Sequence, residues 1–277
     1  MVLTQEALQI TPSAYAVFHR ALRALQEEGV PFTVGGGVAL YFHVGVSRPL
    51  KDLDLFVTPR HVAPALQTLQ RAGFSTTLKH PEWLGQALLD GHQTDVIFGL
   101  GNWLASVDEL WLARSEPRVF LDLSVRLAPP EEMIWSKAFI CARERYDAAD
   151  VFHYLLRLGH RIDWGHLLRR FGEHWEVLLS HLIMFRYIYP ADVDRVPGWV
   201  LDDLLQRLAE ERRRPWRGPR LCRGPLLDGI GSYAVDVTTW GYVDARREAR
   251  QQLVRRLRST PGFPVQAVDP TPDAGGL

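Results

Sequence analysis

Two aspartates one residue apart, Asp52 and Asp54, are the residues of this chain best placed to carry chemistry. They alternate with Leu53 and Leu55 in a stretch with strand character, and a strand points alternate residues to the same face. The two carboxylates are therefore expected to project together, with Cα atoms about 7 Å apart. Because like charges on one face repel, such a pair calls for a cation to neutralise it. Mg²⁺ binds carboxylate and phosphate oxygens together, so the pair indicates phosphate chemistry.

A glycine cluster, residues 35–37, precedes the aspartates. We expect a short strand over residues 31–34 to enter the cluster and a short helix over residues 38–44 to leave it. The helix would then turn its N-terminal amides towards the glycines, an arrangement that suits an anionic phosphate. The cluster fits neither the phosphate loop, which needs Gly-Lys-Ser/Thr, nor the dinucleotide fingerprint.

The elements that must position these residues fall into two groups. Hydrophobic periodicity predicts a helix over residues 11–28 and a second over 59–72, with a tight turn at Asp90-Gly91. The strands predicted with them cover residues 52–57, 74–79, 83–89, 93–98 and 118–127, the last as a strand pair or edge. Helices are predicted behind them at residues 131–145, 148–158, 164–171, 175–187 and 200–213.

This order predicts two domains and a tail. Residues 1–128 would form the catalytic domain, and residues 129–260 a mainly helical domain. Residues 261–277 are rich in Pro, Gly and Asp and are predicted to be disordered. The expected fold class is α+β, a small mixed twisted sheet with flanking helices followed by a helical domain.

Composition limits the possible partners and the cellular location of the protein. The 277 residues have a formal net charge of zero, so no global basic field attracts nucleic acid. Cys141 and Cys222 lack metal-ligand spacing and are expected to be reduced thiols. No apolar run is long enough for a membrane span, and the N-terminus lacks a signal pattern. We therefore expect a cytoplasmic protein with no membrane partner.

One basic loop, residues 212–220, carries an embedded aromatic residue, Trp216. The loop could hold a polyphosphate or an RNA backbone, with Trp216 stacking on a base. The sequence favours the simpler interpretation, a solvated loop in an arginine-rich protein, and leaves the binding interpretation open as the alternative.

The order of the glycines and carboxylates resembles the nucleotidyltransferase superfamily of DNA polymerase β type. The closer resemblance is to its small prokaryotic members, the toxin-like and antibiotic-modifying nucleotidyltransferases. A Gly-Gly-x-Ala stretch at residues 36–39 and an Arg-x-x-Lys-Asp-x-Asp stretch at residues 48–54 carry most of it. A third carboxylate on a later strand is expected, and Asp95 is preferred to Asp90 and Asp122 because apolar residues 96–98 follow it. The resemblance covers roughly residues 30–155.

The resemblance implies transfer of a nucleoside monophosphate from a nucleoside triphosphate to a hydroxyl, with two Mg²⁺ or Mn²⁺ ions. Asp52 and Asp54 would bind both ions, and Asp95 would bind the catalytic ion or accept the proton. Gly36 and Gly37 would let the backbone approach the β- and γ-phosphates; many relatives have serine where Gly37 stands.

Two basic residues are further candidates for binding the triphosphate. Arg48 could reach it, although a surface role suits this residue nearly as well. The resemblance also implies a nucleotide-phosphate contact by Lys137, which precedes a pattern containing Asp147 and Asp150. These two aspartates could orient Lys137 or the acceptor.

The acceptor is not fixed by these residues: a small molecule, a protein side chain and an RNA 3′ end all satisfy the chemistry. The competing interpretation is a non-catalytic module on the same fold that binds a nucleotide or a partner. The intact carboxylates count against it, because a protein without catalysis has no physical need to keep repelling charges together.

Overall fold

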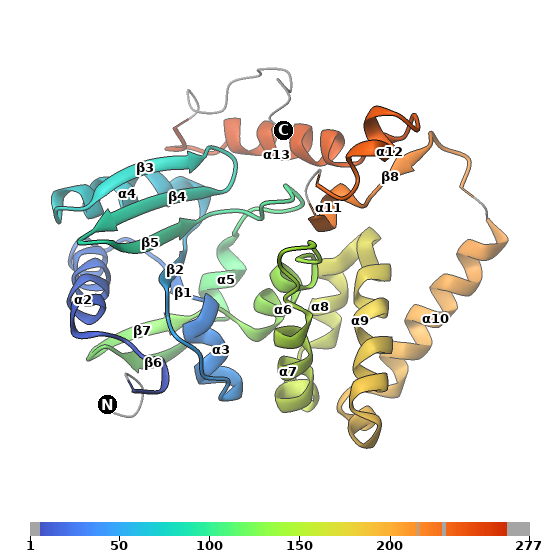
Figure 1. Cartoon of the computed structure of the whole chain (residues 1–277), viewed down its shortest axis with the longest axis horizontal. Coiled ribbons are helices and arrows are strands. Elements are labelled where there is room, and N and C mark those ends of the chain that lie inside the picture. The colour runs from blue at the N-terminus through green and yellow to red at the C-terminus, as the bar shows by residue number, and fades with distance from the viewer. Residues whose placement is uncertain (1–5, 215, 229–230, 265–277) are drawn as a thin grey trace. The chain divides into compact units, whose positions relative to one another are not determined.

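The structure, a computed structural model, describes residues 6–214, 216–228 and 231–264. The chain forms two compact units. Unit 1 consists of Met1–Gly35, Arg48–Leu127 and Arg247–Leu277, and unit 2 of Gly36–Ser47 and Ala128–Arg246. Figure 1 gives the labels of the elements.

Unit 1 is built on a seven-stranded mixed sheet with strand order β3-β4-β5-β2-β1-β7-β6. The strands are β1 (Thr33–Val34), β2 (Asp52–Phe56), β3 (Ser75–His80), β4 (Leu84–Leu89), β5 (His92–Ile97), β6 (Glu116–Phe120) and β7 (Leu123–Leu127). Two neighbouring pairs, β2 with β5 and β1 with β7, are parallel, and the other pairs are antiparallel. The expected α+β class, a mixed sheet with flanking helices and a helical part, is confirmed.

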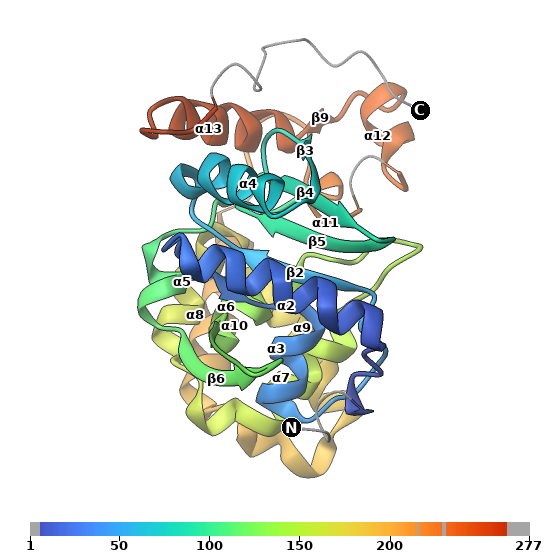
Figure 2. The same cartoon turned by 90° about the vertical axis from the view of Figure 1, so that its left-hand side faces the viewer.

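Two helices, α2 (Pro12–Glu27) and α4 (Val62–Arg71), pack on the sheet (Figure 2). Thr11 caps α2, its hydroxyl accepting from the amide of Ala14 at 3.2 Å, and Pro12 occupies the first helical position. The apolar stripe that this start predicts is buried, with Phe18 and Leu22 fully covered. The sheet and these helices therefore share one hydrophobic core.

The C-terminal part of the chain belongs to unit 1. Helix α13 (Arg246–Arg258) enters it, and its Arg250 pairs with Glu82 at 2.7 Å. Phe263 is buried and its ring lies 5.7 Å from that of Phe98. Most of the tail predicted to be disordered, residues 265–277, lies outside the described residues.

Unit 2 is mainly helical. Its longer helices are α3 (Gly36–Val44), α6 (Pro130–Ala138), α7 (Ala148–Leu158), α8 (Trp164–Phe171), α9 (Trp175–Ile188) and α10 (Gly198–Arg213). Short elements follow: β8 (Leu221–Cys222), α11 (Pro225–Asp228), α12 (Ala234–Thr238) and β9 (Val243–Asp244). Helix α6 packs on α7 and α8, and α3 packs on α7.

Several sequence-based boundaries were wrong. The helix predicted over residues 131–145 ends at Ala138, and Cys141 bridges Tyr146 in the loop that follows. The helix predicted to begin at Val38 begins at Gly36, so the glycines lie inside its first turn. Helix α5 (Glu109–Ala113) and helix α13 were not predicted at all.

Candidate functional site

Three carboxylates lie on one face of the sheet of unit 1. Strands β2 and β5 run parallel, and Asp54 is the direct register partner of Asp95. Paired residues of neighbouring strands point to the same face and their strands lie about 4.8 Å apart. Asp52, two residues before Asp54, shares that face. All three are half-buried.

The opposite face of the same strands is apolar and covered. Leu53, Leu55 and Val96 are fully buried there. Gly85 of β4 pairs with Val96, and a Cβ added to it would lie 3.0 Å from the Leu66 side chain of α4. Helix α4 therefore packs on the leucine face, and the alternation in β2 turns the aspartates to the other face.

Two glutamines hold Asp95, and neither was singled out from the sequence. Gln93 donates from Nε2 to Asp95 Oδ1 at 2.8 Å, and Gln86 donates to the same oxygen at 3.4 Å. Gln93 lies two residues before Asp95 on β5, and Gln86 is the antiparallel partner of Asp95 on β4. The signal was present in the alternation of β5, which places Gln93 on the face of the aspartates.

Burial raises the pKa of Asp95 above its usual value, and the neighbouring charge of Asp52 raises it further. The hydrogen bonds from Gln93 and Gln86, and the charge of Lys79, act in the opposite direction. The net shift is upward, so the ionised form of Asp95 is disfavoured in the protein without a bound cation.

The two other acidic residues considered for the third carboxylate lie at hairpin turns. Asp90 begins the β4–β5 turn with φ +49°, and Gly91 follows with φ +78°, as the predicted tight turn requires. Asp122 sits in the β6–β7 turn and accepts a hydrogen bond from Tyr15 at 2.7 Å. Only Asp95, of these three, is a register partner of Asp54.

The glycine cluster adjoins β2 through its backbone. The amide of Gly35 donates to the carbonyl of Asp54 at 3.0 Å. A Cβ at Gly35 would collide with the ring of Phe56, which is buried and stacks on Trp111 at 4.7 Å. Gly36 begins helix α3 with φ +53°, a conformation that side-chain-bearing residues rarely adopt.

Arg48 is exposed and lies in unit 1, in the irregular segment between α3 and β2. Its predicted contact with the triphosphate stays a prediction.

Lys137 is buried in unit 2 between two carboxylates. Its Nζ lies 3.0 Å from Asp147 Oδ2 and 2.8 Å from Asp150 Oδ2. Arg145 donates to both oxygens of Asp147 at 3.0 and 2.9 Å. These hydrogen bonds and the positive charges lower the pKa of Asp147, against the effect of burial, which is the largest single influence. The early end of α6 explains the cluster, because the loop returns Asp147 to Lys137.

Comparison with protein-family profiles identifies the family of this chain. The profile of a family described as uncharacterised nucleotidyltransferases matches residues 4–179, more than half of the chain. The chain belongs to this nucleotidyltransferase family. Its family identifies it as a transferase, as the resemblance to nucleotidyltransferases implied. No curated protein sequence matches it.

Solved structures similar to this nucleotidyltransferase have low sequence identity. The antibiotic-resistance factor ANT(2'')-Ia is 17% identical over 61% of this chain and 96% of its own, with a TM-score of 0.45. JHP933 from Helicobacter pylori is 14% identical over 76% of this chain and 96% of its own, with a TM-score of 0.39. The lincosamide antibiotic adenylyltransferase LnuA, bound to lincomycin, is 11% identical over 52% of this chain and 96% of its own, with a TM-score of 0.37.

The nucleotidyltransferase carboxylates supply oxygen donors, the ligand type that hard divalent cations prefer. Among the described residues, however, no three His, Cys, Asp or Glu side chains already converge to hold one ion. The donor chemistry therefore fits such an ion, while the arrangement needs further ligands or a side-chain rotation.

The described residues also contain no helix long and apolar enough to cross a bilayer.

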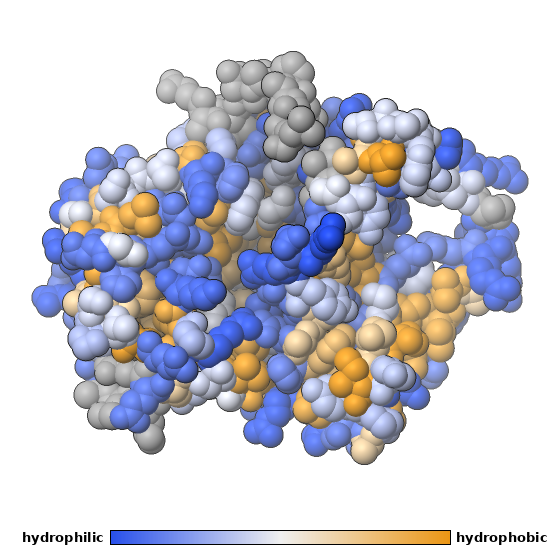
Figure 3. Space-filling model, viewed as in Figure 1, coloured by the Kyte–Doolittle hydropathy of each residue, from blue (hydrophilic) through white to orange (hydrophobic). Residues whose placement is uncertain are grey.

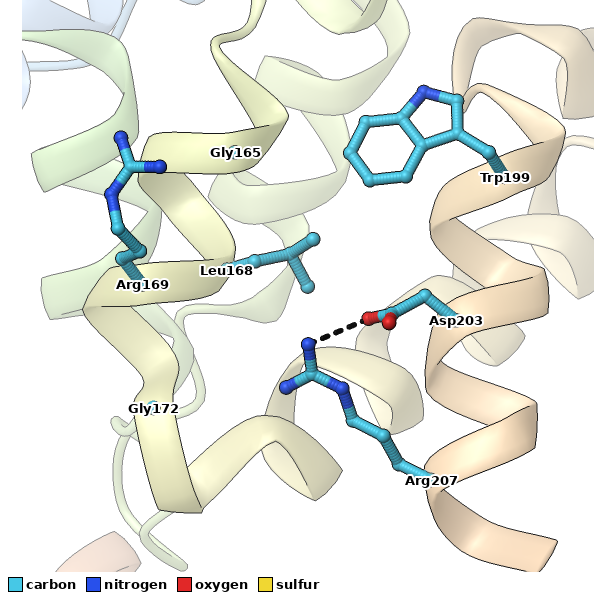
Figure 4. Close-up of a pocket in the computed structure, with 7 residues that line it drawn as sticks. All are labelled: Gly165, Leu168, Arg169, Gly172, Trp199, Asp203 and Arg207. Carbon is cyan, nitrogen blue, oxygen red and sulfur yellow. Dashed lines mark ion pairs between the residues drawn. The ribbon is translucent and has the colours of Figure 1, made fainter.

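Unit 2 of the nucleotidyltransferase has a pocket of its own, of about 540 Å³, between helices α8 and α10 (Figure 4). Trp199 of α10 points towards Leu168 of α8, and Asp203 pairs with Arg207 at 2.8 Å at the lower end. Gly165, Arg169 and Gly172 complete the lining. None of the predicted site residues lines this pocket.

Proposed function

We propose that this protein transfers a nucleoside monophosphate from a nucleoside triphosphate to a hydroxyl acceptor, in a reaction that depends on a divalent cation. One observation carries the proposal: Asp54 is the direct partner of Asp95 in the parallel register of β2 and β5, with Asp52 on the same face. Membership of the nucleotidyltransferase family supports the same chemistry.

Asp52, Asp54 and Asp95 are the proposed metal ligands, for Mg²⁺ or Mn²⁺ and for two ions when the triphosphate is bound. Three carboxylates on one face are costly without a cation, so these residues favour its binding. A bound pair of ions would lower the pKa of the attacking hydroxyl and stabilise the attacking and leaving oxygens. Oxygens of the triphosphate would complete the ligand set that the side chains leave open.

The two glutamines have a proposed positioning role. Both donate to the same oxygen of Asp95, so the carboxylate is fixed while its second oxygen stays available. Their hydrogen bonds also favour the ionised form, which is the form that can bind a cation or accept a proton. Gln93 has the shorter bond and the larger effect on the pKa of Asp95.

The predicted phosphate contacts of Gly36, Gly37, Arg48 and Lys137 stay predictions. Lys137 uses two of its three N–H donors on Asp147 and Asp150, so one donor is left for another group. The cytoplasm, where nucleoside triphosphates occur and free cysteines such as Cys141 persist, is the proposed location.

The test is a transfer assay with nucleoside triphosphates labelled at the α-phosphate, with cell extract as the source of acceptors. We expect label on one acceptor class, protein, RNA or small molecule, that is lost with a chelator and restored by Mg²⁺ or Mn²⁺. The same assay with Asp54→Asn is expected to give no transfer. Metal-independent nucleotide binding without transfer by the wild type would instead identify a binding module.

A further inference from the structure

The end of helix α10 and the segment after it, residues 212–223, are the most basic part of unit 2. Six of the twelve residues from 212 to 223 are arginine and none is acidic. Every described residue from Arg212 to Arg220 is exposed. In the part of this segment that the structure describes, no acidic side chain lies within ion-pair distance of Arg213, Arg214 or Arg217. Figure 3 shows hydrophilic surface at the right-hand edge, where α10 ends.

Exposed aromatic rings lie in the same segment and beside it. The Trp216 side chain is 64% exposed, folds over Gly218 and donates from its indole nitrogen to the carbonyl of Pro219 at 2.7 Å. Trp240 is 56% exposed. Large aromatic rings normally lose water on folding, so two solvated tryptophans within one basic surface point to a ligand with flat faces.

Backbone hydrogen bonds join the stretch that contains Trp240 to the arginine-rich segment. Strands β8 and β9 pair in parallel, with Leu221 opposite Val243, and the amide of Val243 donates to the carbonyl of Arg220 at 2.7 Å. The guanidinium of Arg220 lies over the ring of Tyr242, 4.4 Å from its centroid. Residues 240–243 are therefore held beside Arg220 and Leu221, near the end of the arginine-rich segment. The two stretches together are here called the arginine–tryptophan surface.

We propose that the arginine–tryptophan surface, residues 212–214 and 216–223 with 240–243, binds single-stranded RNA. Unpaired guanidinium groups neutralise phosphates, and exposed tryptophans stack on bases whatever their identity. The bases of a duplex face one another and are closed to such stacking, whereas RNA offers unpaired loops and ends. This binding does not depend on the proposed transfer reaction and is measured without nucleotide.

The test is fluorescence anisotropy of the full chain with a labelled unstructured RNA of about 12 nucleotides, over a series of salt concentrations. Two triple variants have the same change in charge. Arg213→Gln/Arg214→Gln/Arg217→Gln removes unpaired guanidiniums of the surface, and Arg157→Gln/Arg161→Gln/Arg186→Gln removes exposed arginines elsewhere in unit 2. We expect the first to reduce the slope of log affinity against log salt by about 2, and the second to leave it nearly unchanged.

Tryptophan variants distinguish the contribution of base stacking to RNA affinity from the contribution of charge. Trp216→Ala and Trp240→Ala should each weaken binding about 5- to 150-fold with an unchanged salt slope, whereas Trp199→Ala, which removes a comparably exposed ring in the pocket, should bind as the wild type does. Far-UV circular dichroism and melting temperature of each variant establish that it is folded.

Four results would overturn the proposal: no binding at low salt, equal affinity for a duplex, equal losses in the two triple variants, or equally tight binding of polyglutamate, which would indicate an acidic protein partner. Equal affinity for DNA of the same sequence would overturn the assignment to RNA. Loss of transfer with intact RNA binding would count against the proposed function alone.

Discussion

Asp54 and Asp95 occupy the same level of two neighbouring parallel strands, with both side chains on the half-buried face of the sheet. The residues come from distant parts of the chain, and the pairing of β2 with β5 brings their carboxylates together.

Asp54→Asn should abolish detectable transfer, a fall in kcat/KM of at least about 10²–10³-fold, because the site loses a carboxylate proposed to hold the divalent cation that stabilises the transition state. The metal-free variant should be as stable as the wild type or slightly more stable, since a repulsion between carboxylates is relieved. Asp90→Asn is the matched control, the same change at the hairpin turn of the adjacent strand pair, and should transfer normally. Wild-type transfer by Asp54→Asn would exclude this site.

Gln93→Leu should move the acidic limb of the pH profile of kcat/KM to higher pH. The variant removes a hydrogen bond that lowers the pKa of Asp95, so the carboxylate stays protonated to a higher pH and cannot act in its ionised form. Gln86→Leu should shift the limb in the same direction but less, because its bond to Asp95 is longer. If the acidic limb does not move in either variant, Asp95 is not the group whose titration sets it.

Asp95→Asn should raise the melting temperature of the metal-free protein at neutral pH. The folded-state pKa of Asp95 lies above its usual value, so the ionised carboxylate costs stability at high pH and costs nothing below the unfolded-state pKa. The gain should therefore shrink as the pH falls, which melting curves between about pH 4 and pH 7 would measure. Asparagine keeps the oxygen that accepts from Gln93, so the hydrogen bonds are retained.

Lys137→Met should destabilise the protein by about 3–5 kcal/mol, because it removes a buried cation that neutralises Asp150 and, together with Arg145, Asp147. Adding Asp147→Asn and Asp150→Asn should restore most of the loss in melting temperature, since the carboxylate charges that Lys137 neutralises are then removed as well. The restored triple variant tests the phosphate contact: a kcat/KM still reduced by about 10²–10³-fold supports it. If the triple variant has wild-type kinetics, Lys137 contributes to stability and does not contact the phosphates.

Gly35→Ala should cost about 1–3 kcal/mol, because the new methyl group meets the buried ring of Phe56. A second change, Phe56→Leu, should recover part of the loss by removing that ring. Gly198→Ala at the start of α10 is the control, since a Cβ there has no atom within 4 Å. Equal urea midpoints for Gly35→Ala and the wild type would show that the backbone can shift to accept a side chain.

Local pattern alone predicted much of the fold. The α7 and α8 helices begin and end where hydrophobic periodicity placed them, and the Asp90-Gly91 turn has the left-handed conformations that a two-residue hairpin requires. The alternation in β2 also fixed which side of the strand carries Asp52 and Asp54, because one face of the strand had to be buried.

Other features depended on contacts that sequence periodicity does not encode. Helix α13 is almost entirely polar, with only Leu253 and Leu257 buried, so it shows a weak apolar stripe. Helix α6 ends at Ala138, and the loop that follows returns Asp147 to Lys137, whereas Asp150 comes from α7. A continuous helix over the predicted residues would carry Asp147 away from Lys137.

The sequence by itself determined that Asp52 and Asp54 share a face, because the two-residue repeat of a strand is a local property of the backbone. It left Asp90, Asp95 and Asp122 as competing third carboxylates, since each lies on or beside a predicted strand. Only the tertiary structure decided that Asp95 faces Asp54. Parallel register between strands far apart in the chain is set by the packing of the whole sheet, and no short stretch of residues contains it.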